Sequence, residues 1–439
     1  MSSNHDEEDQ VDFVALGNDD SSSGKIHPTP IKHVPVDFVC RFHHNLPDLE
    51  NINPTFLGPE NELTHCPCVV VFGGTETFGA FTQTNSMYVL ECGNIASRNQ
   101  VVSLCNQEQI DYYVDGNLIS NQKGNDKYDE SSSTSSRSEF LFQWKEIEYG
   151  SSEQIPSARE FPCFSYERHS QKCYLFGGYG GHYFNDVWEF NLRNKTWTRL
   201  VTQGNVPSAR CGCSGMANRF GLVVFGGFNG TYLDDFYFLD FKSKTWIKID
   251  SRSMNDSPRT LTVLTNNSFI SDCSFFIFGG YSGTQYKNDF FAFDFNYNND
   301  ARHLGKWKYS LRNLTPTNSS FKANSLMLRG LSSIYGTHMA PGHHSLLISG
   351  YMNNTSVLYE LEEKTKTLYV YDIPSTAQEF DTEIDSSLVF ELDERTVGVL
   401  SKHCLLVLGV RSFKLDFPFL CFRRLYKPEA YSDVRFEWK

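Results

Sequence analysis

Short apolar runs that end in a pair of glycines recur along the chain and predict buried β-strands. In the run over 221–225, Leu222 and Val224 point to one side of a strand, while Val223 and Phe225 point to the other. A strand that is apolar on both sides must be covered on both faces, as in sheets stacked against their neighbours. Four such runs stand out: Val69-Val-Val-Phe-Gly-Gly74, Lys172-Cys-Tyr-Leu-Phe-Gly-Gly178, Gly221-Leu-Val-Val-Phe-Gly-Gly227 and Ser274-Phe-Phe-Ile-Phe-Gly-Gly280.

Further markers follow the glycine pairs in a constant order. A polar pair opens an aromatic strand at Asn185-Asp-Val-Trp-Glu-Phe190, Asp234-Asp-Phe-Tyr-Phe-Leu239 and Asn288-Asp-Phe-Phe-Ala-Phe293. A tryptophan comes next, and an arginine follows it after 15 or 13 residues, in the pairs Trp144 and Arg159, Trp197 and Arg210, and Trp246 and Arg259. Because separate markers keep the same phase, they indicate an internal repeat of about 50 residues.

These residues resemble the Kelch repeat, in which an apolar strand ends in Gly-Gly, an aromatic strand follows, and a Trp precedes the Arg of the next blade. The resemblance is strongest over 144–310. It implies an all-β fold, a β-propeller of four-stranded blades around a central channel. We expect six blades, with five or seven as alternatives. Segments 387–392, 396–400 and 404–410 would build the last blade, and residues 34–40 would supply its missing strand.

Composition divides the chain into a propeller and segments outside it. Residues 1–30 are polar and acidic and are expected to be disordered. The propeller is expected to span 31–430, with a flexible, Ser-rich insertion over 93–138 in the first blade and a short C-terminal tail over 431–439.

The overall charge and hydropathy exclude some classes of partner. There are 39 Lys and Arg against 52 Asp and Glu, a net charge of −13, which argues against nucleic-acid binding because such proteins need a basic surface. No apolar run is long enough to span a membrane, and the first residues do not resemble a secretory signal. We therefore expect a cytoplasmic protein, with the nucleus as an alternative, and 12 reduced cysteines.

Arginines and aromatic residues at equivalent positions are the candidate site. In Kelch adaptor domains that this repeat resembles, matching arginines hold acidic peptides, and aromatic residues after the glycine pair contribute to the rim. The resemblance thus implies a partner-binding rim that takes an acidic or phosphorylated segment. In the alternative, each arginine pairs with Asp or Glu, or caps carbonyls between blades. The candidate rim residues are Arg159, Arg210, Arg259, Tyr179, Phe228 and Tyr281.

The expected function is that of an adaptor or scaffold that binds a protein or peptide on one propeller face. The chain offers no catalytic motif, metal-ligand spacing or cofactor-binding motif, so we expect neither an enzyme nor a cofactor. Two alternatives stay open. One is a propeller enzyme resembling sugar mutarotases or oxidases, which would use the channel mouth as a pocket. The other is contact through the insertion of the first blade. The oligomeric state does not follow from the sequence.

Overall fold

A computed structural model of the protein describes strands and their connecting loops. It describes residues 31–43, 49–50, 53–58, 61–64, 68–76, 82–91, 110–114, 117–118, 143–152, 154–249, 258–266, 274–297, 307–315, 328–336, 345–352, 355–362, 368–372, 388–393, 396–400 and 404–410. Every regular element in these ranges is a β-strand, so the expected all-β class is confirmed. The same ranges hold no helix that could cross a membrane. The predicted tails over 1–30 and 431–439 lie outside the described residues.

Three successive sheets contain four consecutive antiparallel strands each. They correspond to the three best-matched repeats. In the second of them, the short strand β15 (Gln203–Gly204) also pairs in parallel with β19. The sheets are β11 (Cys163–Glu167), β12 (Lys172–Phe176), β13 (Val187–Asn191) and β14 (Thr196–Leu200); β16 (Ser214–Ala217), β17 (Gly221–Phe228), β18 (Tyr232–Asp240) and β19 (Thr245–Ile249); and β20 (Val263–Asn266), β21 (Ser274–Phe278), β22 (Phe290–Tyr297) and β23 (Trp307–Asn313).

The sheet that precedes them is interrupted by the predicted insertion. Its strands are β3 (Thr55–Leu57), β4 (Cys68–Phe72), β7 (Met87–Glu91) and β10 (Gln143–Glu146), and the insertion lies between β7 and β10. A small separate sheet contains β2 (Leu49–Glu50), β5 (Thr75–Glu76) and β6 (Thr82–Gln83).

The remaining strands form one ten-stranded sheet that is joined through the N-terminal strand β1 (Ile31–His43). Residues 31–35 of β1 pair in parallel with β27, and residues 36–43 pair antiparallel with β30. On one side of the joint lie β24 (Leu328–Gly336), β25 (Ser345–Met352), β26 (Thr355–Glu362) and β27 (Leu368–Asp372), and on the other lie β28 (Leu388–Asp393), β29 (Thr396–Leu400) and β30 (Cys404–Val410).

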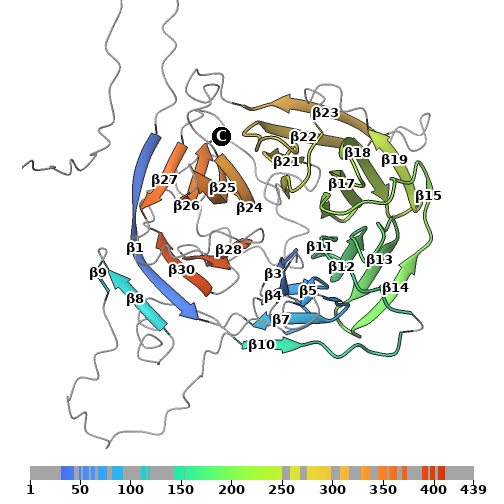
Figure 1. Cartoon of the computed structure of the whole chain (residues 1–439), viewed down its shortest axis with the longest axis horizontal. Helices are drawn as coiled ribbons and strands as arrows, with labels where there is room; N and C mark the ends of the chain where they lie inside the picture. The colour runs from blue at the N-terminus through green and yellow to red at the C-terminus, as the bar shows by residue number, and fades with distance from the viewer. Residues whose placement is uncertain are drawn as a thin grey trace, which may run out of the picture.

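The sheets stand around a ring, as expected for a propeller (Figure 1). Their first strands contact one another in the order β3, β11, β16, β20, β24 and β28, and β28 contacts β3 again. Because β1 fuses two groups of strands into one sheet, hydrogen bonding defines five large sheets, and six separate blades are not confirmed.

Part of the predicted insertion differs from the flexible loop expected from its sequence. Strands β8 (Ile110–Val114) and β9 (Asn117–Leu118) form a hairpin, and β8 pairs antiparallel with residues 39–42 of β1 (Figure 1). Ile, Tyr and Val in this stretch favour strands, and the exposed edge of β1 offers backbone partners. The Ser-rich tract at 131–136 lies outside the described residues.

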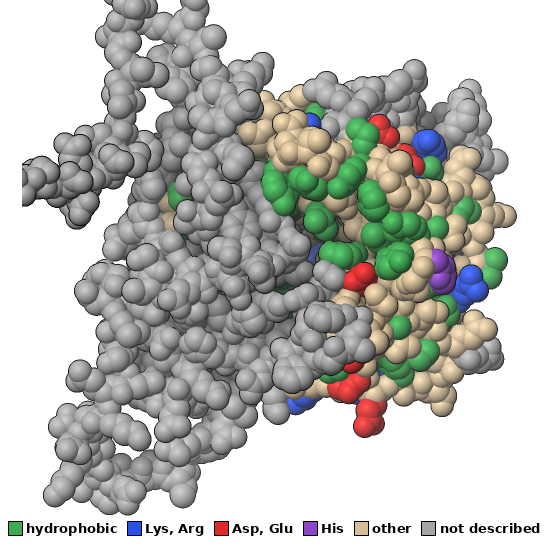
Figure 2. Space-filling model, viewed as in Figure 1, with side chains coloured by type: hydrophobic (Ala, Val, Ile, Leu, Met, Phe, Trp, Pro, Cys, Tyr) green, Lys and Arg blue, Asp and Glu red, His purple; other side chains and the backbone are tan. Residues whose placement is uncertain are grey.

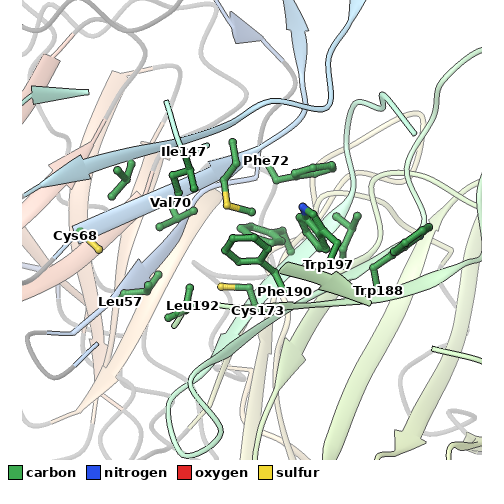
Figure 3. Packing of buried hydrophobic residues seen from close by; sticks show 14 residues of the cluster. Leu57, Cys68, Val70, Phe72, Ile147, Cys173, Trp188, Phe190, Leu192 and Trp197 are labelled. Carbon is green, nitrogen blue, oxygen red and sulfur yellow. The ribbon is translucent and has the colours of Figure 1, made fainter. Parts of the chain in front are cut away.

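The core consists of side chains that interleave between neighbouring sheets. The prediction for β17 is confirmed, since Leu222 and Val224 pack in one buried cluster while Val223 and Phe225 pack in another. Figure 3 shows the corresponding contact between the first sheet and β11–β14. There Trp197 meets Phe72 at a ring-centroid distance of 5.0 Å and Phe190 at 4.9 Å. Burial of these rings stabilises the angle at which one sheet meets the next.

Candidate interaction face

The glycine pairs allow each sheet to approach the next. Gly177 and Gly178 have φ angles of +66° and +104°, in the left-handed region that side chains disfavour. A Cβ on Gly177 would lie 2.6 Å from the carbonyl oxygen of Arg210 in the next sheet. The neighbouring Gly178 N–H donates to this same carbonyl at 2.8 Å. Glycine is therefore required at this position both for its conformation and for the close contact.

The backbone of each repeat arginine is held by the preceding sheet. The Arg210 N–H donates to the Phe184 carbonyl at 2.9 Å, while the Arg210 carbonyl accepts from Gly178. The equivalent bonds recur at Arg159, with Thr84 and Gly74, and at Arg259, with Leu233 and Gly227. Each repeat arginine therefore lies at the junction between two successive sheets.

The side chain of each arginine points into its own sheet and pairs with an aspartate at or near the beginning of the third strand. Arg159 donates to both carboxylate oxygens of Asp186, at 2.6 and 3.0 Å, and to the Gly177 carbonyl at 2.9 Å. Arg210 makes the same contacts with Asp235 and Gly226, and Arg259 makes them with Asp289 and Gly279. Two parallel bonds to one carboxylate suit the planar guanidinium group.

Burial makes these ion pairs part of the interior. The three arginine side chains are at most 1% exposed, and their aspartates are 13–22% exposed. Burial alone raises the pKa of Asp186, but hydrogen bonds and the charge of Arg159 outweigh it and hold that pKa below its ordinary value of 3.8. Burial opposes the charge of Arg210, yet Asp235 raises its pKa above the ordinary value. Asp186 and Arg210 therefore remain charged at neutral pH.

The three repeat arginines were expected to present positive charge at the rim, and their burial corrects this expectation. The guanidinium donors of Arg159, Arg210 and Arg259 are directed to aspartates and glycine carbonyls inside the sheets, so they do not present free positive charge at the rim. The alternative, in which each arginine pairs with an acidic residue, describes the structure. A buried guanidinium needs such a partner because an unpaired charge is costly to bury.

The predicted aromatic residues do lie at the loop surface and continue into a longer row. Tyr179, Phe228 and Tyr281 are partly exposed directly after the glycine pairs. Three further rings lie between and beside them, with successive centroid distances of 5.2, 6.2, 5.1, 5.9 and 4.9 Å. We call this set the aromatic row; in order it contains Tyr179, Tyr183, Phe228, Tyr232, Tyr281 and Tyr286.

Half of the aromatic row was missed in the sequence. Tyr183, Tyr232 and Tyr286 follow the first ring of their repeat by four or five residues, a recurrence that could have identified them. Tyr286 is 43% exposed, and the other five are partly exposed. His182 is exposed beside the row and its ring lies 4.4 Å from that of Phe184. Figure 2 shows hydrophobic side chains gathered toward the middle of the described part of one face.

The described thiols have the properties of structural residues. Burial raises the pKa values of Cys163 and Cys173 well above the ordinary thiol value. Burial, with a contribution from Glu160, raises the pKa of Cys211 to about 11. A nucleophilic or metal-binding cysteine needs the thiolate form, which these environments disfavour. Among the described residues, no group of three or more His, Cys, Asp or Glu is arranged to hold a metal ion.

The fold and this repeated joint define a β-propeller built from equivalent sheets. A family model described as the KLHDC2/KLHL20/DRC7 Kelch-repeats domain matches residues 120–272, which include two of the three buried Arg–Asp pairs complete. The match over these residues and the ring of sheets together support a Kelch-repeat propeller.

A second similarity covers a much shorter stretch. Over 41 residues the chain is 51% identical to "Dynein heavy chain-like protein 2" of Plasmodium falciparum (isolate 3D7). The matched stretch is 9% of this chain and 1% of that protein, so the likeness is local and concerns a small fraction of both.

Proposed function

We propose that the protein is an interaction module that binds a protein or peptide partner along the aromatic row. The Kelch propeller fold is consistent with such a module. The observation that carries the proposal is the continuity of six partly exposed rings across three successive sheets. Tyrosine and phenylalanine offer large, rigid contact area, and tyrosine adds a hydroxyl that stays hydrated or binds a partner.

The backbone that carries the row is held by pairing with neighbouring loop residues, and this supports a role in binding. Tyr179 is paired through its backbone with Glu160, Phe228 with Cys211, and Tyr281 with Thr260. Each pair lies next to a buried arginine whose side chain is fixed at its aspartate. A surface held in this way loses little conformational freedom when a partner binds. The arginines act in this proposal by positioning the rim, and the acidic or phosphorylated partner first expected from them loses its main support.

As part of the same proposal, the protein works as an adaptor or scaffold in the cytoplasm or nucleus. The thiols of Cys68, Cys163, Cys173, Cys211 and Cys213 are free, the form that a reducing compartment maintains. Burial raises the pKa values of Cys163 and Cys173, which disfavours nucleophilic chemistry at these two thiols.

The proposal is tested by affinity capture and mass spectrometry with a variant in which Tyr183 and Tyr232 are both replaced by serine. We expect specific partners to be lost while the thermal unfolding midpoint stays close to that of the wild type. Val201→Ser is the matched control, because Val201 is 83% exposed and lies outside the row. Unchanged capture by the double variant would refute binding through the aromatic row.

A further inference from the structure

An exposed serine completes the hydrogen bonds of the buried Arg210 side chain. Arginine carries five N–H donors. Four of them bond to the Asp235 carboxylate and to the carbonyls of Gly226 and Ser208, and the fifth, at Nη2, donates to the Ser208 hydroxyl oxygen at 2.9 Å. Ser208 itself is exposed, in the loop between β15 and β16. A fully buried cation is therefore in direct contact with a surface hydroxyl.

A side-chain amide contacts the same hydroxyl. Asn229 Nδ2 donates to the Ser208 hydroxyl oxygen at 3.3 Å, and the Asn229 amide oxygen accepts from the Thr231 hydroxyl at 3.2 Å, which orients the amide. Within the described residues, the Ser208 hydroxyl accepts these two hydrogen bonds and donates none. Asn229 directly follows Phe228 of the aromatic row. The hydroxyl therefore lies next to the loop that carries the row, between donors from a cation and an amide.

The equivalent serine of the preceding repeat lacks both contacts. Ser157 lies in the same sequence, Pro-Ser-Ala-Arg, and is also exposed. Arg159 donates to the Ser157 carbonyl at 2.9 Å, but in the described part of the chain no hydrogen bond joins Arg159 to the Ser157 hydroxyl. Gly180 occupies the position that corresponds to Asn229, so it offers no side-chain amide. The two donors at Ser208 are thus particular to this repeat.

We propose that Ser208 is a phosphorylation site and that Arg210 and Asn229 hold its phosphate beside the aromatic row. A serine/threonine protein kinase transfers the terminal phosphoryl group of ATP: the Ser208 oxygen forms the new bond to phosphorus, the bond to ADP breaks, and the hydroxyl proton passes to the kinase base. The phosphate carries a charge of about −1.5 to −2 at neutral pH and accepts several hydrogen bonds, which suits a guanidinium and an amide. Because Asp235 already balances Arg210, the phosphate adds net negative charge to this loop. The site is independent of the partner that the row binds.

Modification is tested on the folded full-length protein with ATP and a serine/threonine kinase chosen because it phosphorylates a peptide of residues 203–213. Phosphopeptide mass spectrometry should find phosphate at Ser208 in the folded protein. Ser208→Ala should lose this phosphopeptide and keep any signal from Ser157. Phosphorylation of the peptide without phosphorylation of Ser208 in the folded protein would overturn the site.

The contacts of the phosphate are tested by phosphorus NMR on full-length protein with phosphoserine in place of Ser208 or, as the matched control, in place of Ser157. Phosphoserine loses its second proton with a pKa of about 6, and donors that stabilise the dianion lower that pKa. It should lie at least about 0.5 lower at position 208 than at position 157. Asn229→Ala should raise it toward the value of the control. Equal pKa values at the two positions would contradict a phosphate held by Arg210 and Asn229.

Discussion

Two parts of the ring join their neighbouring pieces in different ways. One part is the three regular sheets, β11–β14, β16–β19 and β20–β23, and the other is the closing region of β24–β30 and β1. In the regular sheets, one arginine links two sheets, through its backbone to the one before and through its side chain to an aspartate of its own. In the closing region, the long strand β1 pairs with β27, β30 and β8, so backbone ladders join the pieces. The propeller thus uses a repeated side-chain joint along most of the ring and strand pairing where the ring closes.

The largest expected effect comes from breaking one repeated joint. Asp235→Ala leaves the fully buried Arg210 without its carboxylate, which is expected to cost about 3–5 kcal/mol in the free energy of unfolding. Urea denaturation followed by tryptophan fluorescence measures the change.

The matched control is an exposed ion pair. Lys145→Gln removes a partner of Glu91 on the outer strand of the first sheet, where the two side chains are 49% and 31% exposed, and it should cost at most about 1 kcal/mol. If both variants lose the same stability, the aspartates are not essential to the joint.

The second prediction separates the destabilisation caused by a steric contact between sheets from that caused by the backbone conformation. Gly177→Ala forces a Cβ to 2.6 Å from the Arg210 carbonyl at a φ of +66°, and it should destabilise by at least about 2 kcal/mol. Gly181→Ala has a φ of +83° but open space around the Cβ, so it reports the conformational cost alone. Thermal unfolding of both variants should show the larger loss in Gly177→Ala; equal losses would mean that contact between the sheets does not restrict this position.

The third effect is local and concerns the closing region. Tyr112→Pro removes a donor from β8 opposite Cys40 of β1. Hydrogen exchange at residues 39–42 should become about tenfold faster, because the outer ladder on β1 is weakened. The amides of β11–β14 serve as the internal reference and should not change. Unaltered exchange at 39–42 would show that the insertion hairpin does not secure β1.

The smallest effect is a pH dependence carried by a single carboxylate. The folded-state pKa of Asp186 lies below 3.8, so its contribution to stability is complete above that pH and is lost as pH falls through the folded pKa. The urea midpoint of the wild type should therefore fall as pH drops below about 4. In Asp186→Asn, this decrease should be shallower. A parallel decrease in both proteins would assign the acid sensitivity to other groups.

Much of the fold could be predicted because the glycine pairs, aromatic strands and tryptophans repeat in phase. The sequence predicted that residues 34–40 would supply the missing strand of the last blade and so close the ring. In the structure, β1 does pair with β30. The hairpin at 110–118 could not be predicted, since its partner on β1 lies some 70 residues earlier in the chain and no periodic signal marks it. Long-range strand pairing depends on which edge is left open, which the local sequence does not show.

The site was predicted only in part, for a physical reason. The positions of Arg159 and Tyr179 follow from the repeat, but the direction of each side chain does not. Asp186 follows Arg159 by 27 residues, and the sequence shows the pair only as two polar residues in separate motifs. Burial makes that pair obligatory and turns the arginine inward, which leaves Tyr179 and its neighbours at the surface.

The central claim is that the repeat arginines are buried while aromatic side chains form the surface. The most direct test is to treat the native protein with an arginine-specific dicarbonyl reagent and to quantify the modification by peptide mass spectrometry. Arg193, whose side chain is 78% exposed, is the internal reference. The structure predicts that Arg159, Arg210 and Arg259 stay largely unmodified while Arg193 reacts fully, and that all four react after denaturation. Modification of the three repeat arginines in the native protein at the rate of Arg193 would contradict the account.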